Sequence, residues 1–499
     1  MYDVIVVGGG GTGLMSALAA ARHGRSVLLL EKGARLGGTT GLSVGTVCAT
    51  STRLQRQAGI QDHPDSHFAD LDKFVGPLLD RDNLALRRIL VDNVPETIAI
   101  LEDLGITFMG PLPEPPHSKP RLHAIIPHSR GFISHLAHAC RRNGVVIETS
   151  RRVGGLIVEN GRVRGVSLVS GSSASPAGER RARLGVILAT GDFSSAALDY
   201  KQRYMSGPLL EIGGINPLST GDGQKLAEAV GAEVVNGDLA WGPEIRFTAP
   251  PRPSLISRLP TSRWFARLIL AAKAALPDAW LRPFMLGFVT TYLAPSHGLF
   301  RNGAILINRE GQRFCDERQR PQDWIGRQTD QLAYIICDQK IAERFGAWPN
   351  YISTAPGVGY AYLPDYASSR PDLYATAPTL EGLAGKLGVP AAALAASVAA
   401  HNARLAAGGE GDERLPVTTG PFHALGPAKS WIVFSEGGLR IDTDFRVLDS
   451  AGAPVPGLFA AGSAGQGGVL LEGHGHHLGW AFTSGRLAGR NAALSPVPD

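Results

Sequence analysis

The chain begins with a short run of β-branched residues that leads directly into a cluster of glycines. Residues 2–7 read Tyr-Asp-Val-Ile-Val-Val and predict a buried parallel strand. Residues 8–13 read Gly-Gly-Gly-Gly-Thr-Gly and predict a sharp turn into an alanine-rich helix, followed by a second apolar strand that ends in Glu31. A strand, a Gly-x-Gly-x-x-Gly turn, a helix, a strand and an acidic residue about twenty positions further on are typical of a dinucleotide-binding unit.

Each glycine of this turn has a physical role in holding a pyrophosphate. Gly8 permits the tight turn, Gly10 lets the phosphates approach the backbone, and Gly13 lets the helix pack closely on the strand. The free N–H groups and the positive dipole end of the helix then face the phosphates, and Thr12 lies in the same turn. We expect Glu31 to accept hydrogen bonds from a ribose hydroxyl, which disfavours a 2′-phosphate.

The segment after Glu31 helps to decide which dinucleotide is bound. Residues 37–41 read Gly-Gly-Thr-Thr-Gly, where small residues and hydroxyls can wrap a pyrophosphate and a flavin. An NAD-binding domain would normally continue into a plain helix, whereas this turn resembles the second FAD contact of a large flavoprotein superfamily. We therefore predict FAD, with contacts from Lys32, Gly38, Thr39, Thr40, Leu42, Ser43 and Gly45.

The composition argues against several other classes of protein. The net charge of the 499 residues is only +5, and basic residues do not form tracts interleaved with aromatics, so we expect no nucleic acid partner. The four cysteines are scattered without metal spacing, so haem, iron–sulfur clusters and structural zinc have no support. Scattered cysteines, and a functional strand that starts at residue 2 and leaves no room for a leader peptide, predict a cytoplasmic protein. No apolar run is long enough for a transmembrane helix.

The middle of the chain contains a segment of unusual composition. Between residues 244 and 310 the only acidic residue is Asp278, against nine basic residues and several large aromatic ones. Such a stretch, over 255–292, could lie on a membrane surface or admit a lipophilic substrate. We favour the alternative, a pair of helices packed on the rest of the protein or on a second subunit. Before this segment, residues 83–104 carry apolar residues at helical spacing and predict a helix, and residues 153–168 predict a hairpin with an Asn-Gly turn.

Taken together, the motifs resemble the FAD-dependent fumarate reductase/succinate dehydrogenase flavoprotein superfamily, and within it the 3-ketosteroid dehydrogenase branch. The matching segments follow the family's order along nearly the whole chain: 8–13, 38–43, 190–191, 221–223, 303–308, 313–317, 437–439, 457–462 and 485–489. The resemblance implies an α/β fold, in which 1–245 and 426–499 form a Rossmann-like, glutathione reductase-like FAD-binding domain and 246–425 an inserted α+β cap domain. It also implies further FAD contacts at Val153, Ala189, Thr190, Gly191, Gly462, Ser463 and Leu478.

The same resemblance bears on the chemistry. The family makes or reduces a C=C bond next to a carbonyl or carboxylate, moving one hydrogen as hydride and the other through a positioned acid or base. Succinate dehydrogenases attach flavin to a histidine in the segment that is 38–45 here; it contains none, so FAD should be non-covalent. The catalytic arginine of fumarate reductases and a tyrosine of ketosteroid dehydrogenases both fall at Pro321, with Arg320 beside it. Gly475 corresponds to a glycine whose backbone N–H polarises the substrate ketone.

Three histidines, His474, His476 and His477, lie on one glycine-rich loop just before the last predicted helix. A helix N-terminus disfavours imidazolium, so a histidine there stays neutral and can exchange a proton. We expect His476 or His477 to act as the acid or base, with His474 third. The alternatives are exposed histidines without a role, or metal ligands; we predict no metal, because no carboxylate or cysteine cluster accompanies them.

Outside this loop, three residues could also contact the substrate. Tyr360 and Tyr362, on a small-residue loop of the predicted cap, could supply a phenol or simply pack. Arg320 could bind a carbonyl or carboxylate, or lie on a helix surface.

We therefore predict an FAD-dependent dehydrogenase that introduces a C=C bond next to the carbonyl of a lipophilic, cyclic or steroid-like ketone and passes electrons to an unspecified external acceptor. The alternatives are an ene reductase acting on an enone or unsaturated acid, a flavin-dependent oxidase, and a flavin-binding protein without catalysis.

Overall fold

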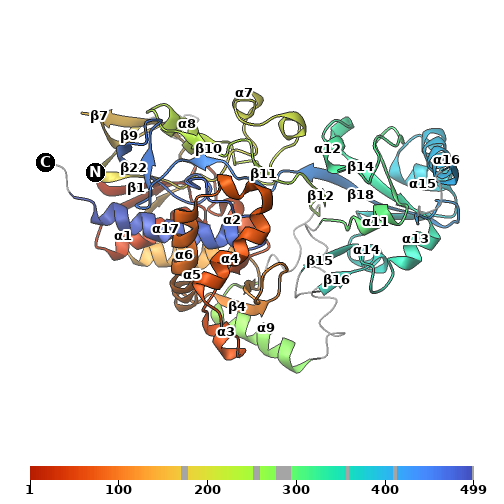
Figure 1. The fold of residues 1–499 in the computed structure, drawn as a ribbon, viewed down its shortest axis with the longest axis horizontal. Coiled ribbons are helices and arrows are strands. Elements are labelled where there is room, and N and C mark those ends of the chain that lie inside the picture. Colours follow the sequence, from red (N-terminus) through yellow and green to blue (C-terminus); the bar gives the residue numbers. More distant parts are fainter. Residues whose placement is uncertain (170–177, 251–258, 277–293, 356–358, 408–412, 497–499) are drawn as a thin grey trace.

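The computed structural model describes residues 1–169, 178–250, 259–276, 294–355, 359–407 and 413–496, which include two large β-sheets (Figure 1). Each of these sheets is surrounded by its own buried apolar core. The α/β fold class is as predicted.

The first sheet is built around the opening strand of the chain. Its central order is β21-β22-β9-β1-β2-β6, in which β1 pairs in parallel with β2 and β9, and only β21 runs antiparallel to its neighbour. Because both faces are covered, the strands read as continuous apolar runs, and residues 4–7 are all buried. The strands are β1 (Tyr2–Val7), β2 (Val27–Leu30), β6 (Val146–Glu148), β9 (Gly178–Leu188), β21 (Arg446–Leu448) and β22 (Pro454–Ala460).

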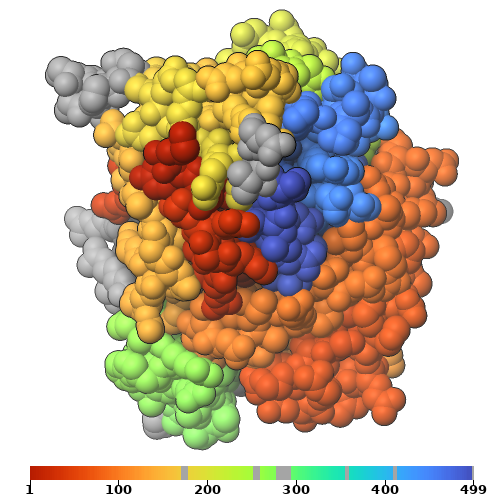
Figure 2. Space-filling model, turned by 90° about the vertical axis from the view of Figure 1, so that its left-hand side faces the viewer, coloured from red at the N-terminus to blue at the C-terminus, as the bar shows by residue number. Residues whose placement is uncertain are grey.

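Helices from both ends of the chain pack together beside this sheet. α1 (Gly11–Arg22) packs on α17 (His476–Leu494), and α5 (Leu84–Asp103) and α6 (Arg130–Arg142) lie against them. The contact is close because a Cβ on Gly485 would lie 2.6 Å from the carbonyl oxygen of Thr12. Figure 2 shows the N-terminal segment in red directly beside the C-terminal segment in blue. The two chain ends thus form one structural unit.

Two local predictions hold in detail. Residues 153–168 form the hairpin of β7 (Val153–Glu159) and β8 (Arg162–Leu168), with Asn160 and Gly161 at positive φ in its turn. The helix predicted over 83–104 is α5, whose N-cap Asn83 accepts a hydrogen bond from the N–H of Leu86.

The second sheet is antiparallel and has the order β12-β18-β14-β13, with β17 also paired to β18. Its strands are β12 (Glu244–Phe247), β13 (Ile305–Ile307), β14 (Ala333–Cys337), β17 (Tyr374–Ala377) and β18 (Phe422–Trp431), and the helices around it are α11 (Gly298–Arg301), α12 (Gln322–Ile325), α13 (Gln339–Arg344), α14 (Leu363–Ser369), α15 (Leu380–Leu387) and α16 (Ala391–Ala407). In Figure 1, β18 reaches from this unit toward the first one. We propose that this unit is the cap predicted over 246–425.

A small three-stranded sheet lies beside the first core. β3 (Thr46–Cys48), β5 (Leu122–Ile126) and β4 (Thr107–Leu112) form it, with α3 (Arg53–Gln57) and α4 (Pro64–Val75) nearby. Of the segment 255–292, only 259–276 is described; it holds α9 (Arg263–Ala275), which packs on β4 (Figure 1). The second helix expected there falls outside the described residues. Within those residues, no helix combines the length and apolar character needed to cross a membrane.

Short elements complete the two units. They are α2 (Gly38–Leu42), η1 (Gly76–Arg81), α7 (Leu198–Lys201), η2 (Gly207–Leu210), α8 (Asp222–Glu228), η4 (Thr329–Gln331) and the two-stranded ladders β10 (Val234–Val235) with β20 (Gly438–Leu439), β11 (Ala240–Trp241) with β19 (Phe434–Ser435), and β15 (Ser353–Ala355) with β16 (Gly359–Ala361).

Candidate active site

A cavity of about 240 Å³ lies at the carboxyl ends of β1 and β2, where a parallel sheet normally binds its ligand. Most of the residues predicted to contact FAD line it: Gly8, Gly10, Thr12, Glu31, Lys32, Gly38, Thr39, Thr40, Leu42, Ser43, Gly45, Val153, Ala189, Thr190, Gly191, Ser463 and Leu478. Gly13 and Gly462 do not line it. They instead pack against the residues that form its wall. A Cβ on Gly13 would be only 1.8 Å from the oxygen of Gly8, and one on Gly462 only 2.3 Å from Oγ1 of Thr12, so both positions require glycine for close packing.

The shape of the opening turn fits a pyrophosphate. A Cβ added to Gly10 would meet its nearest protein atom only at 3.8 Å, so the space beside this backbone is open to a ligand. Glu31 is held in place because its two carboxylate oxygens accept the N–H groups of Gly9 at 2.7 Å and Gly33 at 2.6 Å. Oγ1 of Thr190 is buried without a hydrogen-bond partner among the described residues. These residues fit the predicted FAD.

His477 lines the cavity and is bonded to a carboxylate. Its Nε2 lies 3.1 Å from Oε1 of Glu436, which is buried, and the ring of Phe434 lies against it at a centroid distance of 3.4 Å. If Nε2 carries the proton of that bond, Nδ1 keeps the lone pair. The arrangement can accept a proton and stabilise the imidazolium that results.

His474 also lines the cavity, in a different environment. Its Nδ1 lies 2.5 Å from Oε1 of Glu114, and the same oxygen accepts its backbone N–H. The hydrogen bond to Glu114 raises the pKa of His474, so more of this histidine is protonated near neutral pH. The indole of Trp241 lies 5.8 Å from the His474 ring and 6.4 Å from the His477 ring.

His476 points away from the cavity. Its side chain is buried, Nδ1 donates to the carbonyl of Glu472 at 2.7 Å, and Nε2 has no partner among the described residues. Burial lowers the pKa of His476 to about 3. The expectation that His476 and His477 are equal candidates is therefore not supported, because adjacent residues on a helix project in different directions.

Gly475 is the N-cap of α17, and its backbone lines the cavity. Its φ of +83° suits glycine, and a Cβ there would lie 2.6 Å from the backbone nitrogen of Cys48. The carbonyl of Gly475 accepts the N–H groups of Cys48 at 3.1 Å and Gly479 at 2.9 Å. The peptide between Gly475 and His476 is thus held by two donors.

The three other predicted substrate contacts lie elsewhere, and none of them lines this cavity. Arg320 is exposed and pairs with Asp323. Tyr360 packs its ring on Trp348 and Tyr351, at 5.0 Å in each case. Tyr362 is the N-cap of α14. Helix capping and aromatic packing explain these residues better than substrate binding.

Several lining residues were missed from the sequence. Glu244 and Arg246 on β12 form an ion pair at 2.9 Å, and both line the cavity together with Trp241. They are far in sequence from the histidine loop and carry no motif. The sequence feature that could have drawn attention to them is that Arg246 is the first basic residue of the segment of unusual composition. Glu114 lies in a proline-rich loop that gave no indication of a role.

A family model described as "FAD binding domain" matches residues 3–254 and 266–471. The chain belongs to this FAD-binding family. A 4-oxocyclohexanecarboxylate 2-dehydrogenase of Sinomonas cyclohexanicum is 27% identical over an alignment of 556 positions, which covers 99% of this chain and 93% of that protein.

Two solved structures share the fold. The open conformation of a flavocytochrome c3 fumarate reductase has a TM-score of 0.72 at 24% identity, covering 99% of this chain and 78% of that one. A 3-ketosteroid Δ1-dehydrogenase from Sterolibacterium denitrificans, in complex with 1,4-androstadiene-3,17-dione, has a TM-score of 0.67 at 20% identity, covering 99% and 100%.

The family assignment confirms several predictions. The chain is a member of the flavoprotein superfamily that includes fumarate reductases and 3-ketosteroid dehydrogenases, with the predicted FAD-binding fold. Its cofactor is FAD, and it is an oxidoreductase that acts on CH–CH groups, as a dehydrogenase or a reductase.

Proposed function

We propose that this FAD-dependent oxidoreductase introduces a C=C bond next to the carbonyl of a cyclic ketone. The observation that carries the proposal is the hydrogen bond between His477 and the buried Glu436, because His477 lies in the wall of the same cavity as the residues that fit FAD. When bound, FAD accepts the hydride that leaves the β-carbon. The remaining task of the protein is to remove the α-proton and to stabilise charge on the ketone oxygen.

His477 is the proposed base. The buried carboxylate of Glu436 orients its ring and favours the positive charge that it gains with the proton. Phe434 covers the ring and limits its rotation. His477 thus has both a fixed position and a partner for its charged form.

His474 and the N–H of Gly475 are the proposed partners of the ketone oxygen. The raised pKa of His474 increases the fraction of the ring that is protonated, and in that form Nε2 is a donor while Nδ1 is engaged by Glu114. A protonated donor stabilises the enolate-like charge that develops on the oxygen. The carbonyl of Gly475, on the following peptide, is held by the N–H groups of Cys48 and Gly479, which limits movement of the backbone next to this donor.

A ketone that also bears a carboxylate is the substrate we favour. The relative from Sinomonas cyclohexanicum is named for 4-oxocyclohexanecarboxylate, a cyclic ketone with one carboxylate. Arg246 lines the cavity, in ion pair with Glu244, and can contribute a guanidinium to such a group. Phe434 and Trp241 supply apolar contact for the ring.

The test is anaerobic mixing of the FAD-loaded protein with 4-oxocyclohexanecarboxylate, cyclohexanone and a saturated 3-ketosteroid, followed by the flavin absorbance. We expect the flavin to be reduced by the keto acid. His477→Gln should slow the reduction by about 10²–10⁴-fold. His138→Gln, the same change on the exposed face of α6, should leave it unchanged.

The main alternative is an ene reductase that runs the reverse reaction. If no ketone reduces the flavin, and pre-reduced protein is instead reoxidised by enones or unsaturated acids, the dehydrogenase proposal is wrong. Rapid turnover of a saturated substrate with molecular oxygen alone would indicate an oxidase.

A further inference from the structure

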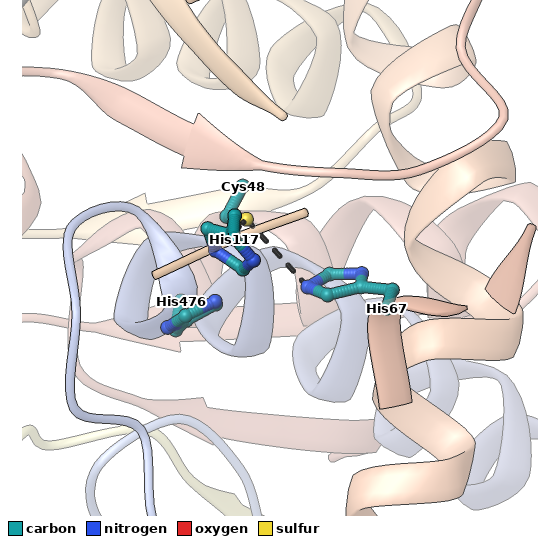
Figure 3. Close-up of side chains that lie close together, drawn as sticks. All are labelled: Cys48, His67, His117 and His476. Atoms are coloured by element: carbon teal, nitrogen blue, oxygen red, sulfur yellow. Dashed lines mark hydrogen bonds between the residues drawn. The ribbon is translucent and has the colours of Figure 1, made fainter. Parts of the chain in front are cut away.

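Four side chains from separate segments meet behind the histidine loop (Figure 3). They are Cys48 at the end of β3, His67 on α4, His117 in the loop before β5, and His476 at the start of α17. One possible ligand atom from each residue lies within 4.8 Å of all the others. All four side chains are buried, with exposed fractions of 1% or less.

Two sulfur-to-nitrogen distances in this cluster are close to the edge of a coordination tetrahedron. With metal–sulfur and metal–nitrogen bonds of about 2.3 and 2.05 Å, ideal tetrahedral geometry separates sulfur from nitrogen by about 3.6 Å. Sγ of Cys48 lies 3.3 Å from Nε2 of His117 and 3.6 Å from Nε2 of His67. The three imidazole rings lie 5.1 to 5.7 Å apart between centroids.

The ring nitrogens are available for coordination. Because Nδ1 of His476 donates to the carbonyl of Glu472, its Nε2 carries a lone pair, and this buried atom has no hydrogen-bond partner among the described residues. His67 turns its Nε2 toward the cluster, 3.6 Å from Sγ of Cys48. A buried acceptor such as Nε2 of His476, aimed into a cluster of sulfur and nitrogen atoms, lacks the group that would satisfy it.

The surroundings of His117 hold both a donor and a carboxylate. Nη1 of Arg121 donates to Nδ1 of His117 at 3.0 Å, and Oδ2 of Asp70 lies 3.9 Å from the same nitrogen. Coordination through Nε2 would therefore require the ring proton to move to Nδ1, where the carboxylate of Asp70 is the nearby acceptor. Phe74 covers the cluster at centroid distances of 4.6 Å from His117 and 5.2 Å from His476.

Coordination requires neutral imidazole rings and a thiolate, so binding of one ion would release the proton of the Cys48 thiol.

We propose that Cys48, His67, His117 and His476 form a structural zinc site with a closed, tetrahedral Cys-His₃ ligand set. Borderline-soft imidazole and thiolate ligands suit Zn²⁺ and exclude the hard ions Mg²⁺ and Ca²⁺. With all four positions filled by protein, the ion has no open site for chemistry. The expectation of no metal rested on the absence of cysteine near the histidines in sequence; the fold brings Cys48 to His476.

The site would hold the loop that forms one wall of the FAD cavity. His476 is a ligand in the proposal, and Gly475 just before it is bonded through its carbonyl to the N–H of Cys48, a second ligand. The ion would thus tie β3 to the start of α17 at the point where Gly475, His474 and His477 line the cavity. This role does not depend on which substrate is used.

The test begins with metal analysis of the FAD-loaded protein after dialysis against a mild chelator and then against zinc-free buffer. We expect about one zinc per chain, and a lower melting temperature after removal by a strong chelator that zinc reverses. Replacement of zinc by Co²⁺ should give the intense visible d–d bands of a tetrahedral site and a thiolate charge-transfer band. These bands are measured as the difference in absorbance between the cobalt-loaded and the zinc-loaded protein.

Variants assign the ligands. In Cys48→Ser the charge-transfer band should vanish and zinc should fall well below one per chain, and His67→Gln should also lose zinc. Cys140→Ser changes a buried cysteine elsewhere in the first core, and this variant should retain both the zinc and the charge-transfer band. If the wild-type protein holds no zinc after incubation with a stoichiometric excess and dialysis, the proposal is wrong and the cluster is hydrogen-bonded only. Zinc content is measured without a ketone, so failure of the zinc proposal can be distinguished from failure of the proposed dehydrogenase reaction.

Discussion

The carboxyl group of Glu436 accepts a hydrogen bond from His477 and is itself held by Gln466 and by the backbone N–H of Leu471. A buried carboxylate with three donors has little freedom to move. The position of the proposed base is therefore determined by residues that do not contact the substrate.

Replacement of Glu436 by glutamine should slow flavin reduction more than it changes substrate binding. The neutral amide no longer stabilises imidazolium at His477, so we expect the rate constant to fall by about 10- to 10³-fold with a smaller change in KM. Stopped-flow reduction at several substrate concentrations separates the two. Glu472→Gln, an exposed change of the same kind on this loop, is the control. An unchanged rate in Glu436→Gln would remove Glu436 from the mechanism.

Two glycines of the opening turn should respond differently to alanine. Gly10→Ala places a Cβ in ordinary contact with the protein but in the space assigned to the pyrophosphate, so the apoprotein should fold normally and bind FAD at least about 10-fold more weakly. Gly13→Ala places a Cβ 1.8 Å from the oxygen of Gly8 and should destabilise the apoprotein itself. Thermal melts and FAD fluorescence titrations distinguish the two. Equal FAD affinity of Gly10→Ala and wild type would contradict the assigned phosphate position.

Arg246→Gln should affect keto acids selectively. If the guanidinium contributes to carboxylate binding, KM for 4-oxocyclohexanecarboxylate should rise by about 10-fold or more, whereas KM for cyclohexanone should change little. Arg327, which pairs with an acidic residue on the surface, offers a matched control as Arg327→Gln. A parallel rise for both ketones would show that Arg246 shapes the cavity without recognising the carboxylate.

FAD should separate from the protein on denaturation. Residues 38–45 contain no histidine for covalent attachment. After precipitation with acid, we expect the yellow colour to remain in the supernatant and the pellet to be colourless. A coloured pellet would indicate a covalent bond and would point to another residue of the cavity.

Lys201 should make stability depend on pH. Its Nζ donates to the carbonyls of Leu209 and Ile212, and burial lowers its pKa from 10.5 to about 8. Between these values the unfolded chain binds a proton that the folded protein does not, so the free energy of unfolding increases with pH. Relative to Lys201→Met, the wild-type protein should gain about 2 kcal/mol between pH 7 and pH 10. Urea unfolding of both proteins at pH 7 and pH 10 measures this difference in the free energy of unfolding. The same pH dependence in wild type and Lys201→Met would contradict the prediction.

Much of the first unit could be predicted from sequence because its signals are local. The strand, turn and helix at residues 2–22 depend on neighbouring glycines, and the hairpin at Asn160 and Gly161 depends on its turn residues. The same holds for α5, which begins after Asn83 as predicted.

The candidate site was only partly predictable because its members come from distant segments. The three loop histidines were recognised, but not that His474, His476 and His477 would find different partners in Glu114, the cysteine cluster and Glu436. Which of two adjacent residues faces a cavity depends on the rotation of α17, and packing decides that rotation. Arg320 was chosen by analogy of position, and Tyr360 because its loop belongs to the predicted cap; their own neighbours hold both away from the cavity.

The pairing of β12 with β18 places the two ends of the second unit next to each other, since Phe247 pairs with Ala428. If this unit is the proposed cap, the chain leaves the FAD-binding unit and returns to it at neighbouring points, which is the geometry that tolerates the insertion or exchange of a whole domain. In evolutionary terms, the stretch between these residues would then be free to lengthen, shorten or be replaced while the sheet around β1 stays unchanged. Glu244 and Arg246 stand at that junction and line the cavity, so changes of substrate there would not require rebuilding the cofactor site.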